Sequence, residues 1–199
     1  KTQVTGNPVR SQLRVLPVVP REPFTVFVFG GSLGAMGISN LVLEALPHLK
    51  DLHGRLRWIH QTGEKDLDRV RKGYAAAGVE GRVESFIHDM ATCYAQASLV
   101  ICRAGSSTLS ELAAVKRASV LVPFPFASDN HQEKNARIFS ERGAAALMIQ
   151  GESSGQDLAN LVRQMIEEPK RRERMEEAAG ALSRPDAALE IVRVLEGKA

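Results

Sequence analysis

The stretch at residues 99–115 constrains the fold of this chain more than any other segment. It opens with the apolar run Leu-Val-Ile-Cys, which is typical of a strand buried on both faces. A glycine at position 105 interrupts the run, and apolar residues then recur at helical spacing at positions 109, 112, 113 and 115. The stretch therefore predicts a strand, a tight turn and a helix in succession.

Small hydroxyl residues occupy this turn, namely Ser106, Ser107 and Thr108. Free backbone N–H groups and the helix dipole at such a helix start suit an anion such as a phosphate. Glu111 follows about one turn later, within reach of a sugar hydroxyl beside that phosphate. The same residues also fit a capping box, Thr108-x-x-Glu111, which is a common pattern and needs no ligand. This stretch by itself leaves both interpretations open.

The same alternation of strand and helix continues along the chain. Apolar segments predict further strands at 25–29, 56–61, 82–87, 119–123 and 144–149, and helices are expected at about 35–49, 65–77, 90–97 and 131–142. The remainder is expected to be helical, with interruptions near Pro169 and Pro185. This order predicts an α/β fold, a Rossmann-like parallel sheet of about six strands with helices on both faces.

Composition and length narrow the class of protein. A chain of 199 residues can form one well-cored domain or half of a larger enzyme. The cysteines, Cys93 and Cys102, form neither a metal-binding pattern nor a disulfide framework, which favours a cytosolic protein. We find no signal peptide and no apolar run near the ~18 residues of a membrane span. The net charge of +3 neither requires nor excludes an anionic partner, and we expect no nucleic acid.

Residues 1–23 differ from the rest of the chain. They contain four prolines and no sustained periodicity, so they are expected to be an interdomain connection, with one domain at 24–199. The chain also begins with Lys1 rather than Met, which suggests that an upstream portion is missing.

Polar and glycine-rich segments fall at the predicted carboxyl ends of the strands, where ligands of parallel sheets bind. The segment 30–34, Gly-Gly-Ser-Leu-Gly, brings the backbone close to a ligand, and Ser32 can donate to a phosphate oxygen. The segment lacks the dinucleotide fingerprint but matches G-x-S-x-G, the nucleophile elbow of serine hydrolases. That distant alternative needs an acid and a histidine, and Asp129 and His131 are too close in sequence to fill both roles easily.

Three weaker patterns have simpler explanations. Asp66-Leu-Asp68 has the form of a metal–diphosphate motif, but acids at a helix start are favoured by the dipole alone. The basic cluster at 170–174 is expected to be a solvated helix face rather than a membrane patch. His131 and Gln132 begin a helix after a polar loop, where polar residues are common without any ligand. Ligand contact stays equally open, because the Gln132 amide can both donate to and accept from sugar hydroxyls.

Five motifs occur in order, and together they carry a family resemblance. They are Thr-Gly-Asn-Pro-Val-Arg at 5–10, Gly-Gly-Ser-Leu-Gly-Ala at 30–35, Phe-Ile-His-Asp-Met at 86–90, Cys-Arg-Ala-Gly-Ser-Ser-Thr-Leu-Ser-Glu at 102–111 and Asp-Asn-His-Gln-Glu-Lys-Asn-Ala at 129–136. Over nearly its whole length the chain resembles the carboxyl-terminal half of the bacterial lipid II synthases, glycosyltransferases of the GT-B fold in family 28. This family moves N-acetylglucosamine from UDP-N-acetylglucosamine onto undecaprenyl-diphospho-muramoyl pentapeptide.

The resemblance implies a donor site at named positions. Arg10 would reach the nucleotide from the domain hinge, Ile87 would present its backbone to the uracil, and Glu111 would bind the ribose hydroxyls. Ser32 and the helix start at 106–108 would lie at the diphosphate and sugar. Gln132 and His131 would hold the sugar, although many family members have a glutamine where this chain has His131. A capping role for Glu111 is compatible with ribose binding.

The resemblance also implies the chemistry and the surroundings. An acceptor hydroxyl would attack the anomeric carbon with inversion while UDP leaves, and a helix N-terminus could stabilise the diphosphate without a metal or other cofactor. Acceptor binding and the general base would belong to an amino-terminal half that is absent here, so we expect this chain to bind donor and transfer poorly or not at all. The full-length enzyme would be cytoplasmic and peripheral on the inner membrane.

Two other functions remain open from the sequence. The soluble subunit of the eukaryotic two-chain N-acetylglucosaminyltransferase that extends dolichyl-diphosphate sugar also resembles this half. The opening Gly-Asn-Pro-Val-Arg looks like an interdomain linker and favours the single-chain enzyme. A domain that only senses a UDP-sugar is the third possibility.

Overall fold

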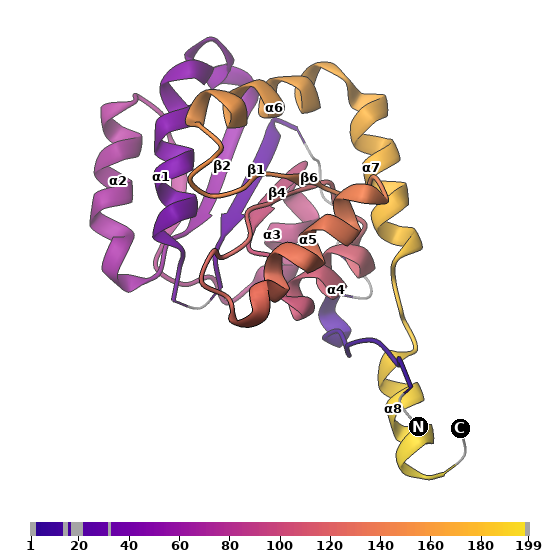
Figure 1. Ribbon diagram of the computed structural model, residues 1–199. Coiled ribbons are helices and arrows are strands. Elements are labelled where there is room, and N and C mark those ends of the chain that lie inside the picture. Colours follow the sequence, from indigo (N-terminus) through magenta and orange to yellow (C-terminus); the bar gives the residue numbers. More distant parts are fainter. Residues whose placement is uncertain (1–2, 14–15, 17–21, 32, 198–199) are drawn as a thin grey trace.

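A computed structural model describes residues 3–197, apart from 14–15, 17–21 and 32. In this part of the chain the strands form one parallel sheet (Figure 1), in the order β3-β2-β1-β4-β5-β6. The strands are β1 (Phe24–Phe29), β2 (Leu56–Gln61), β3 (Gly81–Glu84), β4 (Leu99–Cys102), β5 (Ser119–Leu121) and β6 (Ala146–Leu147). The order reverses between β1 and β4, and this reversal is the point where such sheets bind ligands.

Helices follow nearly every strand. The α-helices are α1 (Met36–Ala45), α2 (Leu67–Ala76), α3 (Met90–Gln96), α4 (Ser106–Val115), α5 (His131–Glu141), α6 (Gly155–Glu167), α7 (Pro169–Ala181) and α8 (Ala187–Leu195). Short 3₁₀ segments are η1 (Ser11–Leu13), η2 (Leu46–Arg55), η3 (Glu64–Asp66) and η4 (Ser128–Asn130). The predicted breaks near Pro169 and Pro185 are confirmed, because α7 begins at the first proline and the second lies between α7 and α8.

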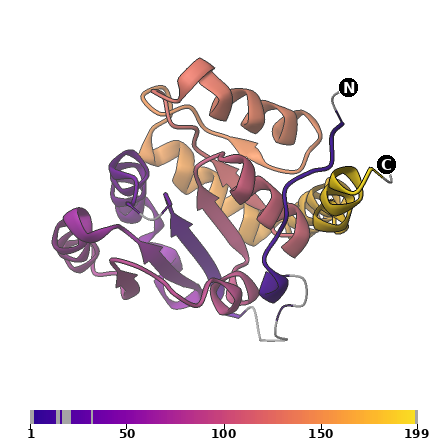
Figure 2. The ribbon, with the colours of Figure 1, turned by 90° about the horizontal axis from the view of Figure 1, so that it is seen from below.

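The sheet separates two apolar cores. Alternate strand residues such as Val26 and Ile101 pack against α1, α2 and α6 on one face. Their neighbours, such as Phe27 and Cys102, pack against α3, α4 and α5 on the other face. Figures 1 and 2 show the sheet between these two layers of helices. The predicted architecture is therefore confirmed.

Several predicted boundaries were wrong. The third strand ends at Glu84 rather than 87, the last strand contains only two residues, and the first helix changes to a 3₁₀ segment at Leu46. The capping box is also wrong, because α4 begins at Ser106 after Gly105, and no side chain caps it. Thr108 is therefore the third helical residue and not the cap.

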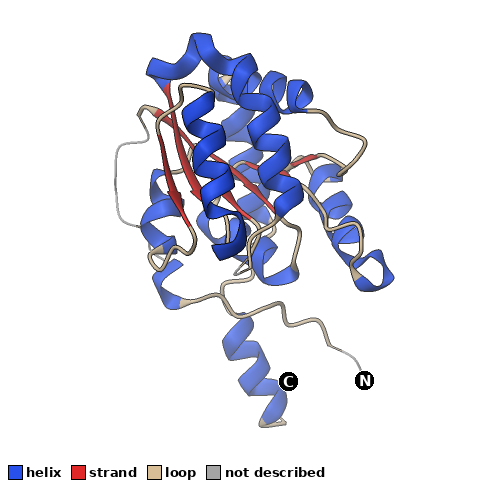
Figure 3. Cartoon of the chain, turned by 90° about the vertical axis from the view of Figure 1, so that its left-hand side faces the viewer, coloured by secondary structure: helices blue, strands red, loops and turns tan. Residues whose placement is uncertain are grey.

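The two ends of the described chain lie together, away from the sheet. Figures 1 and 3 show α8 projecting from the two helix layers, close to the first described residues of the chain. Helix α8 has exposed apolar residues, including Leu189 and Leu195. Within the described residues no helix is both long enough and apolar enough to cross a membrane.

Candidate functional site

Two cavities open beyond the carboxyl ends of the strands, and both are lined by Gly31. The Glu111 cavity has a volume of about 410 Å³ and is lined by Arg10, Phe29, Gly31, Gln61, Phe86, Ile87, His88, Met90, Ser107, Thr108 and Glu111. The Gln132 cavity has a volume of about 610 Å³ and is lined by Gly30, Gly31, Leu33, Gly34, Ala35, Met36, Gly37, Asn40, Arg103, Phe124, Gln132 and Gln150. One elongated ligand could therefore occupy both cavities across the loop that follows β1.

Glu111 lies on α4 with both carboxylate oxygens engaged. The Arg10 Nη2 atom is 2.8 Å from Oε1, so the connecting segment is tied to the site. The Tyr94 hydroxyl donates to Oε2 at 3.1 Å. The residues predicted at the nucleotide, Arg10 and Glu111, are thus in direct contact although they lie far apart in the sequence.

Ile87 lies beyond β3 and is held by a side chain that the sequence interpretation did not assign. Its N–H donates to Gln61 Oε1 at 2.8 Å, and the Gln61 amide donates to the Gly31 carbonyl at 2.9 Å. Gln61 therefore links the Ile87 segment to the glycine loop. Since the N–H of Ile87 is occupied, its carbonyl is the backbone group that remains for a ligand.

The start of α4 faces the Glu111 cavity without a protein cap. Ser107 and Thr108 line the cavity, whereas Ser106 lines neither cavity, and its carbonyl accepts a hydrogen bond from Ser110. Because the cap residue is Gly105, no cap side chain accepts from the first N–H groups of α4. An anionic group in the cavity would fill that role.

Glycines shape the loop between the two cavities. Gly34 has φ +76°, and a Cβ atom there would lie 1.7 Å from the Thr62 carbonyl oxygen. Gly63 has the same φ, and a Cβ atom there would lie 2.2 Å from the Leu33 carbonyl oxygen. The loops after β1 and β2 approach each other so closely that neither position accepts a side chain. Ser32 itself lies outside the described residues.

Arg103 organises the Gln132 cavity. The guanidinium group is largely buried and donates to the carbonyls of Val122 (3.0 Å) and Pro123 (2.9 Å), and to Gln150 Oε1 at 2.8 Å. It also lies 5.3 Å from the centre of the Phe124 ring. Burial lowers the pKa of Arg103 to about 10, so the group is still a cation at neutral pH. A positive charge is therefore fixed at the wall of this cavity.

Gln132 is oriented by the same loop. The N–H of Phe124 donates to Gln132 Oε1 at 3.0 Å, which leaves the amide Nε2 as the donor for a ligand. His131 lines neither cavity, and its Nδ1 atom is 2.8 Å from the Ser128 carbonyl oxygen. The structure brings Gln132 to the site but does not bring His131 to it.

The other sequence patterns lie outside these cavities. Asp66 accepts two hydrogen bonds from Arg69, at 2.6 and 2.9 Å, and neither Asp66 nor Asp68 lines the Glu111 or the Gln132 cavity. In the described part of the chain no three potential metal ligands gather. Asp66 directly precedes α2 and Asp68 lies in its first turn, as the helix-start interpretation predicts.

Sequence reasoning missed the roles of Gln61, Tyr94 and Arg103. The first and last could have been suspected from their place at the carboxyl edge of the sheet, because Gln61 ends β2 and Arg103 directly follows β4. Tyr94 gave no signal, since an aromatic residue inside an amphipathic helix is normally a core residue. It is a core residue, but its hydroxyl reaches Glu111.

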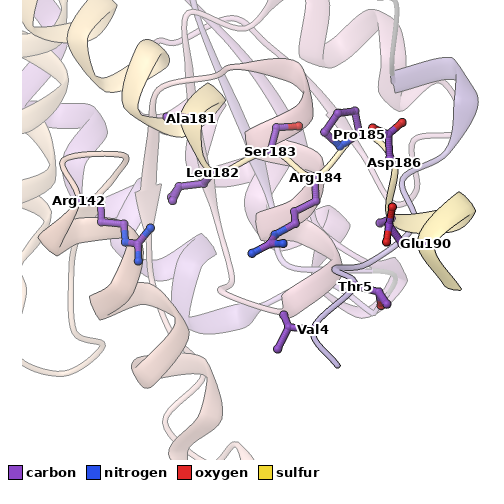
Figure 4. Close-up of a pocket in the computed structure, with 11 residues that line it drawn as sticks. Val4, Thr5, Arg142, Ala181, Leu182, Ser183, Arg184, Pro185, Asp186 and Glu190 are labelled. Carbon is purple, nitrogen blue, oxygen red and sulfur yellow. The ribbon is translucent and has the colours of Figure 1, made fainter. Parts of the chain in front are cut away.

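A third cavity, of about 450 Å³, lies near the two ends of the described chain (Figure 4). Val4 and Thr5 line it from the N-terminal segment and Arg142 from the end of α5, and the remaining lining residues lie at 181–190. None of the predicted site residues lines this cavity.

The fold is a parallel α/β sheet with two cavities that share Gly31, and comparison with known proteins assigns the family of the chain. The family model of the glycosyltransferase family 28 C-terminal domain matches residues 25–191. This chain therefore belongs to the family of glycosyltransferase family 28 C-terminal domains. That assignment favours glycosyl transfer over the serine hydrolase alternative.

The curated relatives agree on one enzyme. A Myxococcus xanthus protein, 48% identical over 98% of this chain and 51% of its own length, is named UDP-N-acetylglucosamine–N-acetylmuramyl-(pentapeptide) pyrophosphoryl-undecaprenol N-acetylglucosamine transferase. A Geobacter protein with the same name is 43% identical over 99% of this chain and 54% of its own length. The crystal structure of Acinetobacter baumannii MurG matches with a TM-score of 0.78 and 30% identity, over 97% of this chain and 54% of that one. The chain thus spans about half the length of the relatives it matches.

Proposed function

We propose that this chain is the UDP-N-acetylglucosamine-binding half of a glycosyltransferase that makes lipid II for peptidoglycan. The acceptor would be undecaprenyl-diphospho-muramoyl pentapeptide. The observation that carries the proposal is the pair of cavities that meet at Gly31, one with Glu111 and the other with Gln132. The names of the relatives support the identity of the donor and acceptor.

In this proposal the uridine of the donor lies in the Glu111 cavity and its sugar lies in the Gln132 cavity. The uridine occupies the Glu111 cavity, with the uracil at the Ile87 carbonyl and the ribose hydroxyls donating to Glu111. The diphosphate crosses at Gly31, where the uncapped N–H groups of α4 face it. The sugar occupies the Gln132 cavity, whose free amide Nε2 donates to a sugar oxygen. Ser32 is proposed at the diphosphate and His131 near the sugar only on the strength of the family motif.

The chemistry follows from this placement. The acceptor hydroxyl oxygen attacks the anomeric carbon, the bond from that carbon to the diphosphate oxygen breaks, and UDP leaves with the electron pair. The helix N-terminus of α4 and the buried cation of Arg103 stabilise the negative charge that develops on the leaving group. No metal or other cofactor is required in this proposal.

The acceptor side belongs to the missing half. The hydroxyl proton passes to a general base that we place, with the acceptor site, in the amino-terminal half of the full-length protein. That protein would be cytoplasmic, would act at the inner-membrane surface where the lipid acceptor lies, and would bind no nucleic acid. Relatives about twice as long as this chain favour a single-chain enzyme over a two-chain one.

Calorimetric titration of the chain with UDP-N-acetylglucosamine, UDP-glucose and UDP, in the presence of EDTA, tests the proposal. We expect binding of all three, tightest for the first, and a fall of about tenfold or more in affinity for Glu111→Gln, since a hydroxyl–carboxylate hydrogen bond contributes about 1.5–3 kcal/mol. Glu190→Gln, on α8, is the control and leaves the affinity unchanged. Absence of binding to all three nucleotides would contradict the proposed donor site.

A further inference from the structure

Tyr94 is buried, yet its hydroxyl reaches a charged side chain of the site. It is 0% exposed, and its ring packs edge-on against Phe27 and Phe29, with centroid distances of 5.6 and 6.0 Å. Only the hydroxyl is directed at a polar partner, Glu111 Oε2, at 3.1 Å. A phenylalanine would fill the same apolar space, so the packing alone does not account for a tyrosine at this position.

The backbone carbonyl of Tyr94 is also fixed, by a hydrogen bond from Arg117. Arg117 Nε donates to the Tyr94 carbonyl at 2.7 Å, and Arg117 Nη2 donates to the Ala95 carbonyl at 3.4 Å. These bonds tie the end of α3 to Arg117, two residues beyond α4, the helix that carries Glu111. The hydroxyl of Tyr94 is therefore held at a defined position relative to Glu111.

The hydroxyl acts as a donor under all ordinary conditions. Burial raises the pKa of Tyr94 well above its usual value, and the neighbouring Glu111 carboxylate raises it further. The phenol therefore keeps its proton. A fixed donor on Oε2 and the Arg10 donor on Oε1 leave the Glu111 carboxylate as an acceptor with a set orientation.

We infer that Tyr94 is a positioning residue that holds Glu111 for the two hydroxyls of a ribose. The inference rests on the proposed function and deepens it. An oriented carboxylate accepts from a vicinal diol, whereas it repels a phosphate at the same place. Tyr94 thus makes the site selective for a ribonucleotide over its deoxy form, while the charge of Glu111 disfavours a 2′-phosphate.

The test compares the affinities of UDP and 2′-deoxy-UDP for the wild-type chain and for Tyr94→Phe. The variant keeps every ring contact and loses only the hydroxyl. We expect the wild type to bind UDP about tenfold more tightly than 2′-deoxy-UDP. In Tyr94→Phe this preference is expected to fall to about twofold, because an incorrectly oriented Glu111 carboxylate forms only a weak hydrogen bond with the 2′-hydroxyl. The affinity for 2′-deoxy-UDP is expected to change by less than about twofold.

Tyr74→Phe is the matched control. Tyr74 is also buried, at 2% exposure, and its hydroxyl is 3.2 Å from His60 Nδ1, away from both cavities. Loss of this hydroxyl removes a comparable buried hydrogen bond and leaves the preference for UDP intact. The unfolding midpoints of the two Phe variants show whether they are destabilised to a similar degree.

A double variant with Glu111→Gln separates the inference from the proposed function. If Tyr94 acts through Glu111, Tyr94→Phe lowers the affinity for UDP when Glu111 is present. The double variant then binds UDP with the same affinity as Glu111→Gln alone. An equal loss of affinity for UDP and 2′-deoxy-UDP in Tyr94→Phe, or no loss at all, would overturn the inference while leaving the donor site in place. Binding of UDP that is insensitive to Glu111→Gln would overturn both the ribose role of Glu111 and the role of Tyr94.

Discussion

At the scale of single residues, the candidate site depends on buried polar side chains that hold the groups lining its cavities. Gln61 positions Ile87, Tyr94 positions Glu111, and Arg103 fixes the loop whose N–H orients Gln132. In each case a buried side chain restricts the orientation of a group that lines a cavity, directly or through the loop that carries that group. This arrangement prepares the site before a ligand arrives and lowers the entropic cost of binding.

Arg103 is expected to be the most costly of these residues to lose. In Arg103→Met the Val122 and Pro123 carbonyls lose their donor within the protein, and a buried acceptor without a partner costs about 1–3 kcal/mol. We expect urea unfolding to show a loss of about 3 kcal/mol. Arg137→Gln, which breaks an exposed ion pair with Glu133, is the control and changes stability by less than about 1 kcal/mol. Equal effects of the two substitutions would contradict the role of Arg103.

His60 gives the fold a pH dependence of its own. Burial lowers its pKa to about 4 from 6.5, so the folded protein holds this ring neutral. Its contribution to stability is complete above pH 6.5 and is lost as the pH falls from 6.5 towards 4, because only the unfolded chain then binds the proton. Between pH 7 and pH 5 the loss amounts to about 2 kcal/mol.

The measurement is the free energy of unfolding at both pH values for the wild type, His60→Gln and His48→Gln. His60→Gln is expected to lose this pH-dependent part, and His48→Gln, at an exposed position, is the control for replacing a histidine by glutamine. A His60→Gln variant with the same pH dependence as the wild type would show that the burial of His60 is not its source.

At the scale of elements, two helices differ in how their N-termini are capped. Helix α6 begins with a complete capping box, in which Ser154 Oγ accepts from the Asp157 N–H at 3.2 Å and Asp157 accepts from the Ser154 N–H at 2.8 Å. Helix α4 begins at the site after Gly105, with no side-chain cap. The open helix start is the one that faces the proposed diphosphate.

Substitutions at the two helix starts are therefore expected to differ. Ser154→Ala removes a cap and is expected to cost about 1 kcal/mol of stability in chemical denaturation. Ser107→Ala removes no cap bond and is expected to change stability by less than about 0.5 kcal/mol. A larger loss for Ser107→Ala than for Ser154→Ala would mean that the Ser107 hydroxyl supports α4 itself.

The glycine loop provides a second prediction at this scale. In Gly34→Ala the new methyl group would meet the Thr62 carbonyl, so the loop between the cavities must move, and donor affinity should fall by about tenfold or more. Gly78→Ala is the control, because Gly78 also has a positive φ, of +69°, but has open space around its Cβ position. Calorimetry should show unchanged donor affinity for Gly78→Ala. Equal affinities for the two variants would contradict the proposed path of the diphosphate.

The sequence was a good guide to the elements and a partial guide to the site. Buried parallel strands have strong apolar runs, so the sheet and the position of the cavities at its carboxyl edge could be predicted. The capping box could not be rejected, because Thr108-x-x-Glu111 fits the pattern and only the backbone shows that α4 begins at Ser106. Tyr94 could not be found, since its contact with Glu111 joins two helices on one face of the sheet.

At the scale of the whole molecule, we propose a donor site for this chain and assign no acceptor site within the described residues. It covers about half of the Myxococcus xanthus relative, and the Glu111 cavity includes Arg10 from the connecting segment. We therefore expect the 199-residue chain to bind UDP-N-acetylglucosamine but to transfer no sugar to a lipid-linked muramoyl pentapeptide. A radiolabelled-sugar transfer assay, with a full-length relative as the positive control, tests this expectation. Turnover by the chain alone would place the general base within these residues.

The position of a bound donor tests the central claim most directly. A crystal structure of this chain with UDP-N-acetylglucosamine is expected to show the ribose hydroxyls on Glu111, the diphosphate at Gly31 and the start of α4, and the sugar at Gln132. A donor bound in the reverse direction, or in the cavity between Arg142 and Arg184, would contradict the account.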